Sequence, residues 1–392
     1  ASFRNILNYL EVNQPQDCLK LMRMVPELGR WDDLLVLQTP DMKAKAFTMI
    51  HEALKANNGL AAKWMPRQGQ VATELRKHFG LTPKAYRQWL VSLTNVVETP
   101  MAANNWESID YSKVPSLAMS RYKRAFNRHG LGFKAYVQEL SSGNPNVKVN
   151  ATAVYPYDVL KGRLSHRLAY DKTELDLIEA QWKALPNYVG ASNVLPLVDV
   201  SGSMNVQISE SLTAMDVAVS LGLYFADKNQ GVFKDCFLTF SGEPELLNLR
   251  GSINQKIDQM IQSSWGMNTD LNKAMNLILQ TAIDGHVTQQ EMPQILIILS
   301  DMQFDRCANL TGFEMIKEQY SNAGYTCPNI VFWNLKAYGN VPVRFNQDGV
   351  ALISGFSPAI AEAFLSGDIS NFTPEGIMLK KIMNERYDPN MY

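Results

Sequence analysis

The stretch PLVDVSGSM, residues 196–204, decides the fold because an apolar run passes directly into oxygen-bearing side chains at alternating positions. Buried strands normally end in a turn that contains Gly, Asn or Pro. This segment ends instead in Asp199, Ser201 and Ser203. Two interpretations are open at this point. Either a serine caps a following helix, or the three side chains contribute to a cation site.

Apolar, strand-like segments alternate with amphipathic helical segments from about residue 192 onward. The predicted strands cover residues 193–200, 235–241, 293–301 and 328–335, with 349–355 as a further edge strand. The predicted helices cover residues 211–228, 269–283 and 313–324. Such alternation indicates βαβ units, so we expect an α/β fold in which helices cover both faces of a doubly wound parallel sheet.

The first half of the chain has a different pattern of apolar residues. Apolar residues recur at helical spacing, for example in residues 41–56, 71–80 and 83–97, and short breaks with Gly or Pro separate these segments. A succession of short helices joined by tight turns predicts an α-helical repeat domain of HEAT type, although no repeat of fixed period is found. The expected fold class is therefore mixed, with the helical repeat domain over residues 1–190 and the α/β domain over residues 191–392.

Length and composition bound the class of protein. The chain has 392 residues, of which 46% are hydrophobic and 19% charged, as expected for a soluble globular protein with about two domains. No apolar run reaches the ~18 residues that a membrane span needs, and no secretory leader opens the chain. The four cysteines lack metal-type spacing and are typical of free thiols in a reducing compartment. We expect a cytoplasmic protein without membrane contact.

The net charge of −1 hides two oppositely charged halves. Residues 1–190 contain 25 Lys and Arg against 17 Asp and Glu, whereas residues 191–392 contain 12 against 21. The basic excess is strongest in residues 63–134, which hold twelve basic side chains and four acidic ones. A basic half is compatible with a polyanionic partner.

Five oxygen donors in the second half are predicted to form one metal site. Asp199, Ser201 and Ser203 follow one strand, Thr269 precedes a helix, and Asp301 follows another strand. Ligands of such sheets bind at the carboxyl ends of the strands, where these loops would meet. Hydroxyl and carboxylate oxygens without imidazole or thiolate suit Mg²⁺, Mn²⁺ or Ca²⁺. Taken singly, Ser201, Ser203 or Thr269 is better explained as a helix cap, but the combination favours the metal.

Signals for catalysis or nucleotide binding are missing from the sequence. None of the five histidines stands near a Ser or Cys in a pattern that suggests a nucleophile and its base. No phosphate-binding G-x-x-x-x-G-K-[ST] run is present, and no glycine fingerprint follows a strand. A nuclease with one cation at Asp199 and Asp301 would lack a general base and a second metal. We therefore expect no enzymatic activity.

The motif DVSGSM (199–204), followed along the chain by NTD (268–270) and then by LSD (299–301), resembles the metal-ion-dependent adhesion site of von Willebrand factor A domains. All five motif positions match, and the resemblance covers roughly residues 190–392. It implies that Asp199, Ser201, Ser203, Thr269 and Asp301 hold the cation. It also implies a protein partner whose own carboxylate completes the coordination, and a binding role rather than a catalytic one.

A basic helical region joined to an A domain is similar to the Ro autoantigen (TROVE-type) RNA-binding proteins. The runs PELGRWDDLL (26–35), AAKWMPR (61–67), VPSLAMSRY (114–122) and WGMNTDLNKA (265–274) also resemble relatives of that family. The resemblance implies binding of small structured RNAs or of single-stranded RNA ends, as part of a ribonucleoprotein. In Ro proteins the helices close into a ring, whereas the helical region that precedes the A domain in this chain is shorter than such a ring.

Basic and aromatic residues alternate in RKHFGLTPKAYRQW (76–89) and SRYKRAFNRHG (120–130). Arginine binds phosphate bidentately, and aromatic rings stack on unpaired bases. The alternative is that the basic residues form a solvated face without a partner and that the aromatic residues pack in the core. The residues predicted to contact RNA are Lys63, Arg67, Arg76, Lys77, Lys84, Arg87, Arg121, Lys123, Arg124 and Arg128.

Two functions from different classes remain open. The first is a non-catalytic, Ro-type RNA-binding protein whose A domain recruits a protein partner through Mg²⁺. The second is a structural or assembly protein that uses both domains for protein contacts, with the basic face meeting an acidic partner. Bound RNA that co-purifies with the protein and is removed by high salt would separate the two.

Overall fold

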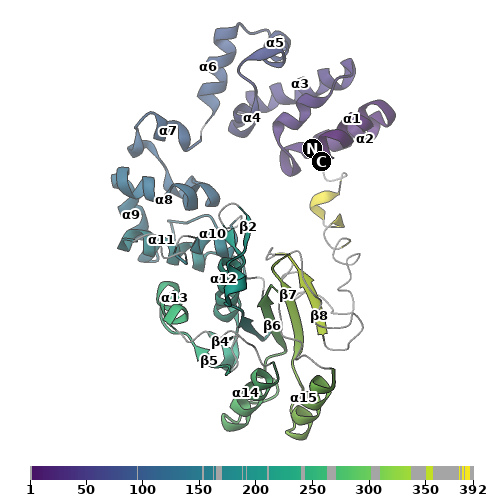
Figure 1. Cartoon of the computed structure of the whole chain (residues 1–392). Coiled ribbons are helices and arrows are strands. Elements are labelled where there is room, and N and C mark those ends of the chain that lie inside the picture. Colours follow the sequence, from purple (N-terminus) through teal and green to yellow (C-terminus); the bar gives the residue numbers. More distant parts are fainter. Residues whose placement is uncertain are drawn as a thin grey trace. The chain divides into compact units, whose positions relative to one another are not determined.

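The chain folds into two compact units. The computed structural model describes all residues except 1, 95, 152–153, 162, 165–169, 188, 191, 210–211, 240–242, 263–270, 302–309, 337–349, 356–378, 380–381, 384 and 389–392. Unit 1 comprises Ala1–Ile109 together with Thr373–Tyr392, and unit 2 comprises Asp110–Phe372. The chain therefore passes from one unit to the other twice (Figure 1).

The described part of unit 1 is helical. Its α-helices are α1 (Ser2–Asn13), α2 (Pro15–Leu28), α3 (Pro40–Lys55), α4 (Gly59–Trp64), α5 (Gly69–His78), α6 (Pro83–Leu93) and α7 (Glu98–Ala102). Its 3₁₀ turns are η1 (Trp31–Val36), η2 (Trp106–Ser108) and η7 (Glu385–Tyr387). Helices that follow one another in the chain pack together, as α1 does with α2, α3 with α4 and α5 with α6. Such neighbour pairing is the pattern expected of an α-helical repeat region.

Local signals fix where these helices begin. Proline occupies the first position of α2, α3 and α6, where its missing N–H costs no hydrogen bond. The buried Glu11 carboxylate of α1 accepts hydrogen bonds from the backbone N–H groups of Gln38 and Thr39, at 2.9 and 3.0 Å, just ahead of α3. A buried acceptor from one helix thus orders the start of another.

Unit 2 begins with five helical elements, of which α10 and α11 pack against its sheet. They are η3 (Tyr111–Lys113), α8 (Ser116–His129), α9 (Leu131–Ser141), α10 (Pro156–Leu160) and α11 (Lys172–Lys183). Trp182 of α11 is 1% exposed, lies edge-on to Tyr224, and donates its indole N–H to Asp227 at 3.0 Å. Residues of α10 and α11 therefore share one hydrophobic core with the sheet.

The sheet has six strands in the order β5-β4-β1-β6-β7-β8. They are β1 (Val194–Val198), β4 (Cys236–Thr239), β5 (Leu246–Asn248), β6 (Ile295–Ser300), β7 (Asn329–Asn334) and β8 (Val350–Ser354). All neighbours pair in parallel except β4 and β5, which are antiparallel. A separate hairpin of β2 (Gln207–Ser209) and β3 (Leu212–Thr213) follows η4 (Gly202–Asn205). In chain order the large sheet reads 3-2-1-4-5-6, the order of doubly wound dinucleotide-binding folds.

Helices cover both faces of this sheet (Figure 1). The remaining elements are α12 (Ala214–Lys228), η5 (Gly231–Phe233), α13 (Ile253–Gln262), α14 (Leu271–Asp284) and α15 (Leu310–Asn322). Val194 and Val198 of β1 point into the core shared with α12 and α13, whereas Leu195 and Leu197 point into the core shared with α14 and α15. Gly222 permits α12 to approach the sheet, since a Cβ there would lie 2.4 Å from Val198 Cγ2.

The predicted mixed fold class is confirmed: a helical region precedes an α/β unit with a mostly parallel, doubly wound sheet. The predicted strands over 193–200, 235–241, 293–301, 328–335 and 349–355 correspond to β1, β4, β6, β7 and β8. The short elements β2, β3, β5 and α13 were not predicted. The change from helices to strands falls near residue 190, and the domain boundary expected there stays a prediction. None of the described helices is long and apolar enough to span a membrane.

Candidate functional site

The strand order creates a switch point between β1 and β6. From β1 the chain proceeds to β4 and β5 on one side of the sheet, and then returns to β6, β7 and β8 on the other. Loops at such a point diverge and leave room for a ligand at the carboxyl ends of the two strands. Asp199 directly follows β1, and Asp301 directly follows β6. The two predicted carboxylates therefore lie at the position where this fold class binds its ligands.

The Asp199 carboxylate is buried and held in one orientation. Its side chain is 1% exposed. Oδ1 accepts a hydrogen bond from the backbone N–H of Ser201 at 2.9 Å, and Oδ2 accepts one from the Ser300 hydroxyl at 2.6 Å. The Asp199 N–H itself donates to the Leu299 carbonyl at 2.9 Å. Each carboxylate oxygen keeps a further lone pair for a cation or for a water bound to it.

Ser201 and Ser203 bring their hydroxyls together. Their Oγ atoms lie 3.0 Å apart, and both residues are half-buried. Ser201 stands at the N-cap position of η4, but its side chain makes no capping hydrogen bond. The capping interpretation is therefore wrong for Ser201. The next α-helix, α12, is capped by Thr213, whose Oγ1 accepts from the Asp216 N–H at 3.1 Å.

Asp301 is fully buried beside this group, and Thr269 lies outside the described residues. The pKa of Asp199 is raised above its ordinary value mainly because burial disfavours the charged form. Hydrogen bonds from Ser300 and Ser201 act against this shift, and the negative charge of Asp301 adds to it. Two neighbouring buried carboxylates create a region of negative electrostatic potential, which suits a cation.

The chemistry and spacing of the described donors fit a hard divalent ion. An octahedral Mg²⁺ with bonds of ~2.1 Å places neighbouring ligand oxygens roughly 3.0 Å apart. The two serine hydroxyls already have that separation. Among the described residues, no group of three or more His, Cys, Asp and Glu side chains could hold a metal. The site thus depends on hydroxyls as well as carboxylates, and its Mg²⁺ assignment stays a prediction.

Ser300 is a residue of the candidate site that the sequence prediction did not include. Its side chain is fully buried at the end of β6, and it fixes the Asp199 carboxylate from the neighbouring strand. The signal was present in the LSD motif, because a serine directly before Asp301 lies in register with the residue after β1.

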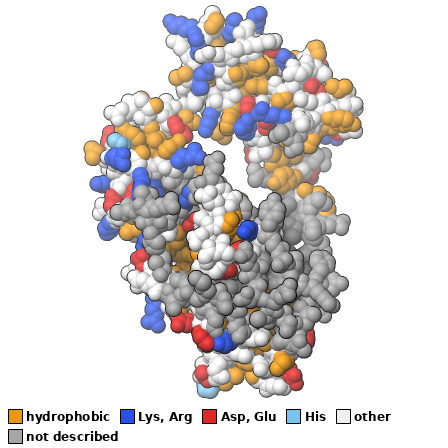
Figure 2. All heavy atoms as spheres, in the orientation of Figure 1, with side chains coloured by type: hydrophobic (Ala, Val, Ile, Leu, Met, Phe, Trp, Pro, Cys, Tyr) orange, Lys and Arg blue, Asp and Glu red, His pale blue; other side chains and the backbone are white. Residues whose placement is uncertain are grey.

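The predicted RNA-contacting residues fall in both units. Six of them lie in unit 1, and all but the partly buried Arg76 are exposed: Lys63, Arg67, Arg76, Lys77, Lys84 and Arg87. Figure 2 shows Lys and Arg side chains gathered over α5 and α6. Lys43 and Glu74 form an ion pair of 2.6 Å between α3 and α5, so Glu74 is already neutralised. This surface of unit 1 presents a net positive charge.

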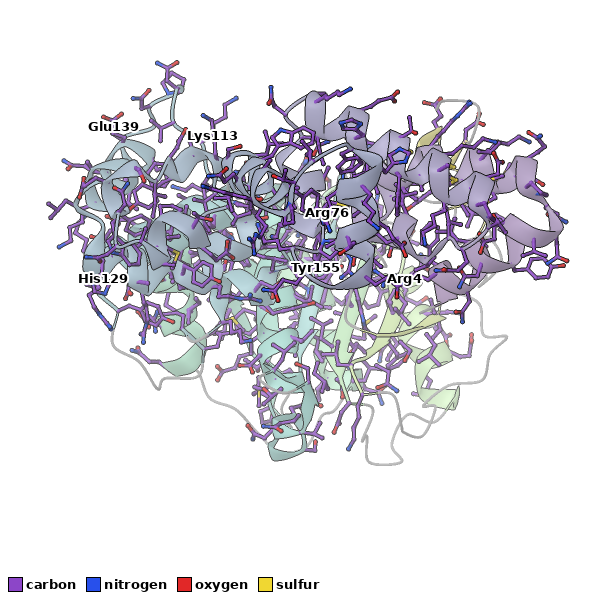
Figure 3. All side chains as sticks on the ribbon, turned by 90° about the horizontal axis from the view of Figure 1, so that it is seen from above. Arg4, Arg76, Lys113, His129, Glu139 and Tyr155 are labelled. Carbon is purple, nitrogen blue, oxygen red and sulfur yellow. The ribbon has the colours of Figure 1, made fainter. Side chains whose placement is uncertain are left out.

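The four residues on α8 differ in accessibility. Arg121 and Arg128 are exposed. Arg124 is partly buried, with its guanidinium carbon 5.1 Å from the centre of the Tyr170 ring and its Nε 3.7 Å from Glu174 Oε1. His129, at the end of α8, and Glu139 on α9 are exposed and point away from the helices of this unit (Figure 3).

Lys123 lies inside the helical layer rather than on its surface. It is 6% exposed, and its ammonium lies 5.4 Å from the centre of the Tyr170 ring. Burial, partly opposed by Glu174, lowers the pKa of Lys123 to about 8. A buried ammonium cannot reach a phosphate without a rearrangement of α8, so the position of Lys123 does not suit the contact predicted for it.

Comparisons with known proteins assign the chain to a family. A family model described as a domain of unknown function, DUF7788, matches residues 193–389, about half of the chain. The chain belongs to this family. The DUF7788 match begins one residue before β1 and contains all five predicted metal ligands. A second model of a domain of unknown function, DUF2828, matches residues 41–193 and contains all ten predicted RNA-contacting residues.

One curated relative of this DUF7788 protein is the uncharacterized protein L728 of Acanthamoeba polyphaga mimivirus. The two sequences are 32% identical over 441 aligned residues, covering 95% of this chain and 74% of the relative. Among solved structures, the Ro (RSR) protein of Deinococcus radiodurans gives a TM-score of 0.45 and 14% sequence identity, covering 89% of this chain and 84% of that chain. This structural similarity is weak, and the assignment of the fold rests on the helices and strands of this chain alone.

Proposed function

We propose that this protein is a non-catalytic RNA-binding protein whose helical half binds RNA phosphates through exposed Lys and Arg side chains. The observation that carries the proposal is the accessibility of the predicted set. Seven of its ten members are exposed, namely Lys63, Arg67, Lys77, Lys84, Arg87, Arg121 and Arg128. Surface lysines and arginines in such excess over acids attract a polyanion and release its counterions. Because the helical half resembles Ro-type proteins in sequence, RNA is the proposed polyanion.

The α/β half is proposed to bind Mg²⁺, or Mn²⁺ or Ca²⁺, at Asp199, Ser201, Ser203, Thr269 and Asp301. The described donors offer hard oxygens, buried negative charge and a serine pair with the right separation. A cation bound there would supply an open coordination position for a carboxylate. Because the serines are half-buried and the aspartates buried, a partner would approach from the serine side. The partner is proposed to be a protein with an exposed Asp or Glu.

The RNA half of the proposal is tested first by purification. Protein isolated at low salt is expected to carry RNA, seen as a high ratio of absorbance at 260 and 280 nm, which falls after a high-salt wash or RNase treatment. A protein that is free of nucleic acid, and whose assemblies are insensitive to RNase, would instead support an assembly protein whose basic face binds an acidic protein.

The metal half is tested by calorimetry with Mg²⁺ alone. Asp199→Ala is expected to remove binding, whereas Asp284→Ala removes an exposed carboxylate at the end of α14 and is expected to bind as the parent does. Equal Mg²⁺ affinity of the parent and Asp199→Ala would remove the site from the proposal, and would leave the RNA half untouched.

A further inference from the structure

A cluster of aromatic rings that are not buried lies on three helices of unit 1, and two of the rings belong to residues 76–89, where basic and aromatic residues alternate. It consists of His51 on α3, His78 at the end of α5 and Trp89 on α6. We call these three residues the aromatic patch. The patch surrounds Phe79, which is 8% exposed and belongs to the core of the unit. The alternative of a packed core thus holds for Phe79 and in part for Trp89, which packs against that core but is only partly buried. It does not account for the accessible surface of the three rings.

The rings of the patch are held in fixed orientations. His51 stacks on Phe79 with ring centres 4.5 Å apart and an interplanar angle of 21°. Trp89 lies edge-on to both rings, at 5.8 Å from His51 and 6.3 Å from Phe79. His78 is fixed by Thr48, whose Oγ1 lies 3.3 Å from His78 Nε2. Rings with fixed orientations lose little conformational entropy when a planar ligand stacks on them.

Among the residues that the structure describes, the polar edges of the His51 and Trp89 rings have no hydrogen-bonding partner. In the described part of the chain, neither the His51 ring nitrogens nor the Trp89 indole N–H forms a hydrogen bond to another residue, and neither ring is buried. The patch therefore offers aromatic surface together with free donor and acceptor positions. This combination suits a heteroaromatic ligand better than an aliphatic side chain, which would use only the ring surface.

The charge around the patch is mainly positive. Lys55, one turn after His51, and Lys77, directly before His78, are exposed, and Glu52 is the exposed acid next to His51. Burial, Lys55 and His78 all lower the pKa of His51, which favours its neutral, stacking form. A nucleotide combines a planar heteroaromatic base with an anionic phosphate, and both features find a counterpart here.

We propose that the aromatic patch binds an unpaired RNA base that stacks on His51 with its edge against Trp89, whose ring stands at 81° to His51, while Lys55 and Lys77 contact the phosphates on either side. This inference rests on the proposed RNA binding and selects the single strand from the two kinds of RNA that the Ro resemblance implies. Bases inside an A-form duplex are stacked on one another and cannot reach such rings. Stacking on aromatic residues also tolerates any base, so the patch would select strandedness rather than sequence.

The test compares fluorescence anisotropy of a labelled 12-nucleotide oligoadenylate with that of a 12-base-pair RNA duplex. The variant is His51→Ala with Trp89→Ala, and Tyr9→Ala is the matched control, because Tyr9 is an exposed ring of the same unit outside the patch. The double variant is expected to bind the single strand about tenfold or more weakly than the parent, with duplex binding and the salt slope unchanged. Tyr9→Ala is expected to leave both affinities as they are.

A conservative variant separates stacking from folding. His51→Phe with Trp89→Phe retains two rings and is expected to restore most single-strand affinity, with a circular dichroism melt matching that of the parent. If the parent binds RNA and the double alanine variant binds the single strand equally well, the base site is wrong while RNA binding stands. Equal loss of single-strand and duplex binding also overturns the base site. A parent that binds neither RNA would instead overturn the proposed function.

Discussion

Ser300 donates a hydrogen bond from its hydroxyl to Asp199 Oδ2 at 2.6 Å, across the two central strands of the sheet. The donor is the last residue of β6 and the acceptor directly follows β1, so the bond joins the two strands at the switch point. Both residues are buried, so little water competes for the bond. The orientation of the Asp199 carboxylate is therefore set by the sheet rather than by a flexible loop.

Ser300→Ala is expected to weaken Mg²⁺ binding about tenfold while leaving all five predicted ligands in place. Groups that orient metal ligands typically contribute 10–100-fold to affinity. Calorimetric titration with Mg²⁺ measures the change. Ser220→Ala is the control, since it removes a buried hydroxyl whose hydrogen bonds stay within α12. An unchanged affinity in Ser300→Ala would mean that Asp199 does not need this orientation to bind the ion.

The location of the candidate site could be predicted from sequence because parallel strands follow a strict rule. Apolar runs identified β1 and β6, and the carboxyl ends of neighbouring parallel strands meet at one edge. Asp199 and Asp301 were therefore assigned to the same edge without coordinates. The antiparallel β5 and the hairpin of β2 and β3 escaped prediction because segments of two or three residues carry too little periodicity.

The accessibility of single side chains on α8 could not be predicted in the same way. Arg121, Lys123, Arg124 and Arg128 read as one basic run, and only the packing of α11 decides which of them reaches solvent. Arg124 lies close to the Glu174 carboxylate of α11. The cationic groups of Lys123 and Arg124 both contact the ring of Tyr170, just before α11. These partners lie far from α8 in the sequence, with α9 and α10 between them, so local periodicity carries no sign of the contact.

Arg121→Glu with Arg128→Glu is expected to lower RNA affinity and to flatten its dependence on salt. Both side chains are exposed, so each can neutralise one phosphate in the parent and repels one in the variant. Losing two contacts should reduce the slope of log affinity against log salt by about 1.4 for a single strand. Fluorescence anisotropy at several salt concentrations gives both quantities.

The matched control reverses two basic residues of the α/β half, Arg250→Glu with Lys317→Glu, and so changes the net charge by the same amount. If the slope and affinity fall equally in both variants, RNA responds to net charge alone and α8 has no special part. If neither variant differs from the parent, the exposed arginines of α8 do not contact RNA.

Gly222→Ala is expected to destabilise the α/β unit by about 1–3 kcal/mol, the usual cost of overpacking a core. The added methyl would lie 2.4 Å from Val198 Cγ2, well inside contact distance, so α12 or β1 must move. Urea denaturation measures the loss. Shortening the opposing side chain in Gly222→Ala with Val198→Ala should recover part of it, because the two changes share one contact. If the losses of stability in the two single variants simply add in the double variant, the contact between residues 222 and 198 is not the cause of the destabilisation.

Lys123 makes a pH-dependent contribution to stability whose sign follows from its burial. Its pKa is about 8 in the folded protein, mainly because burial disfavours the ammonium, against an ordinary value of 10.5. Below pH 8 the lysine is charged in both states, and the folded state bears the full cost of the buried charge. Between pH 8 and 10.5 the folded state has released its proton and the unfolded state has not, so folding stability rises with pH in this window.

Lys123→Met is therefore expected to stabilise the protein at pH 7, by up to about 3 kcal/mol, and to remove the rise between pH 8 and 10.5. The attraction to Glu174 that the variant loses is already included in the balance that lowers the pKa of Lys123. Urea denaturation at pH 7, 9 and 10.5 measures the difference between variant and parent. Lys134→Met removes the same charge from an exposed position on α9 and should show no such pH dependence. A parent more stable than Lys123→Met at pH 7 would show that the ammonium stabilises the helical layer rather than straining it.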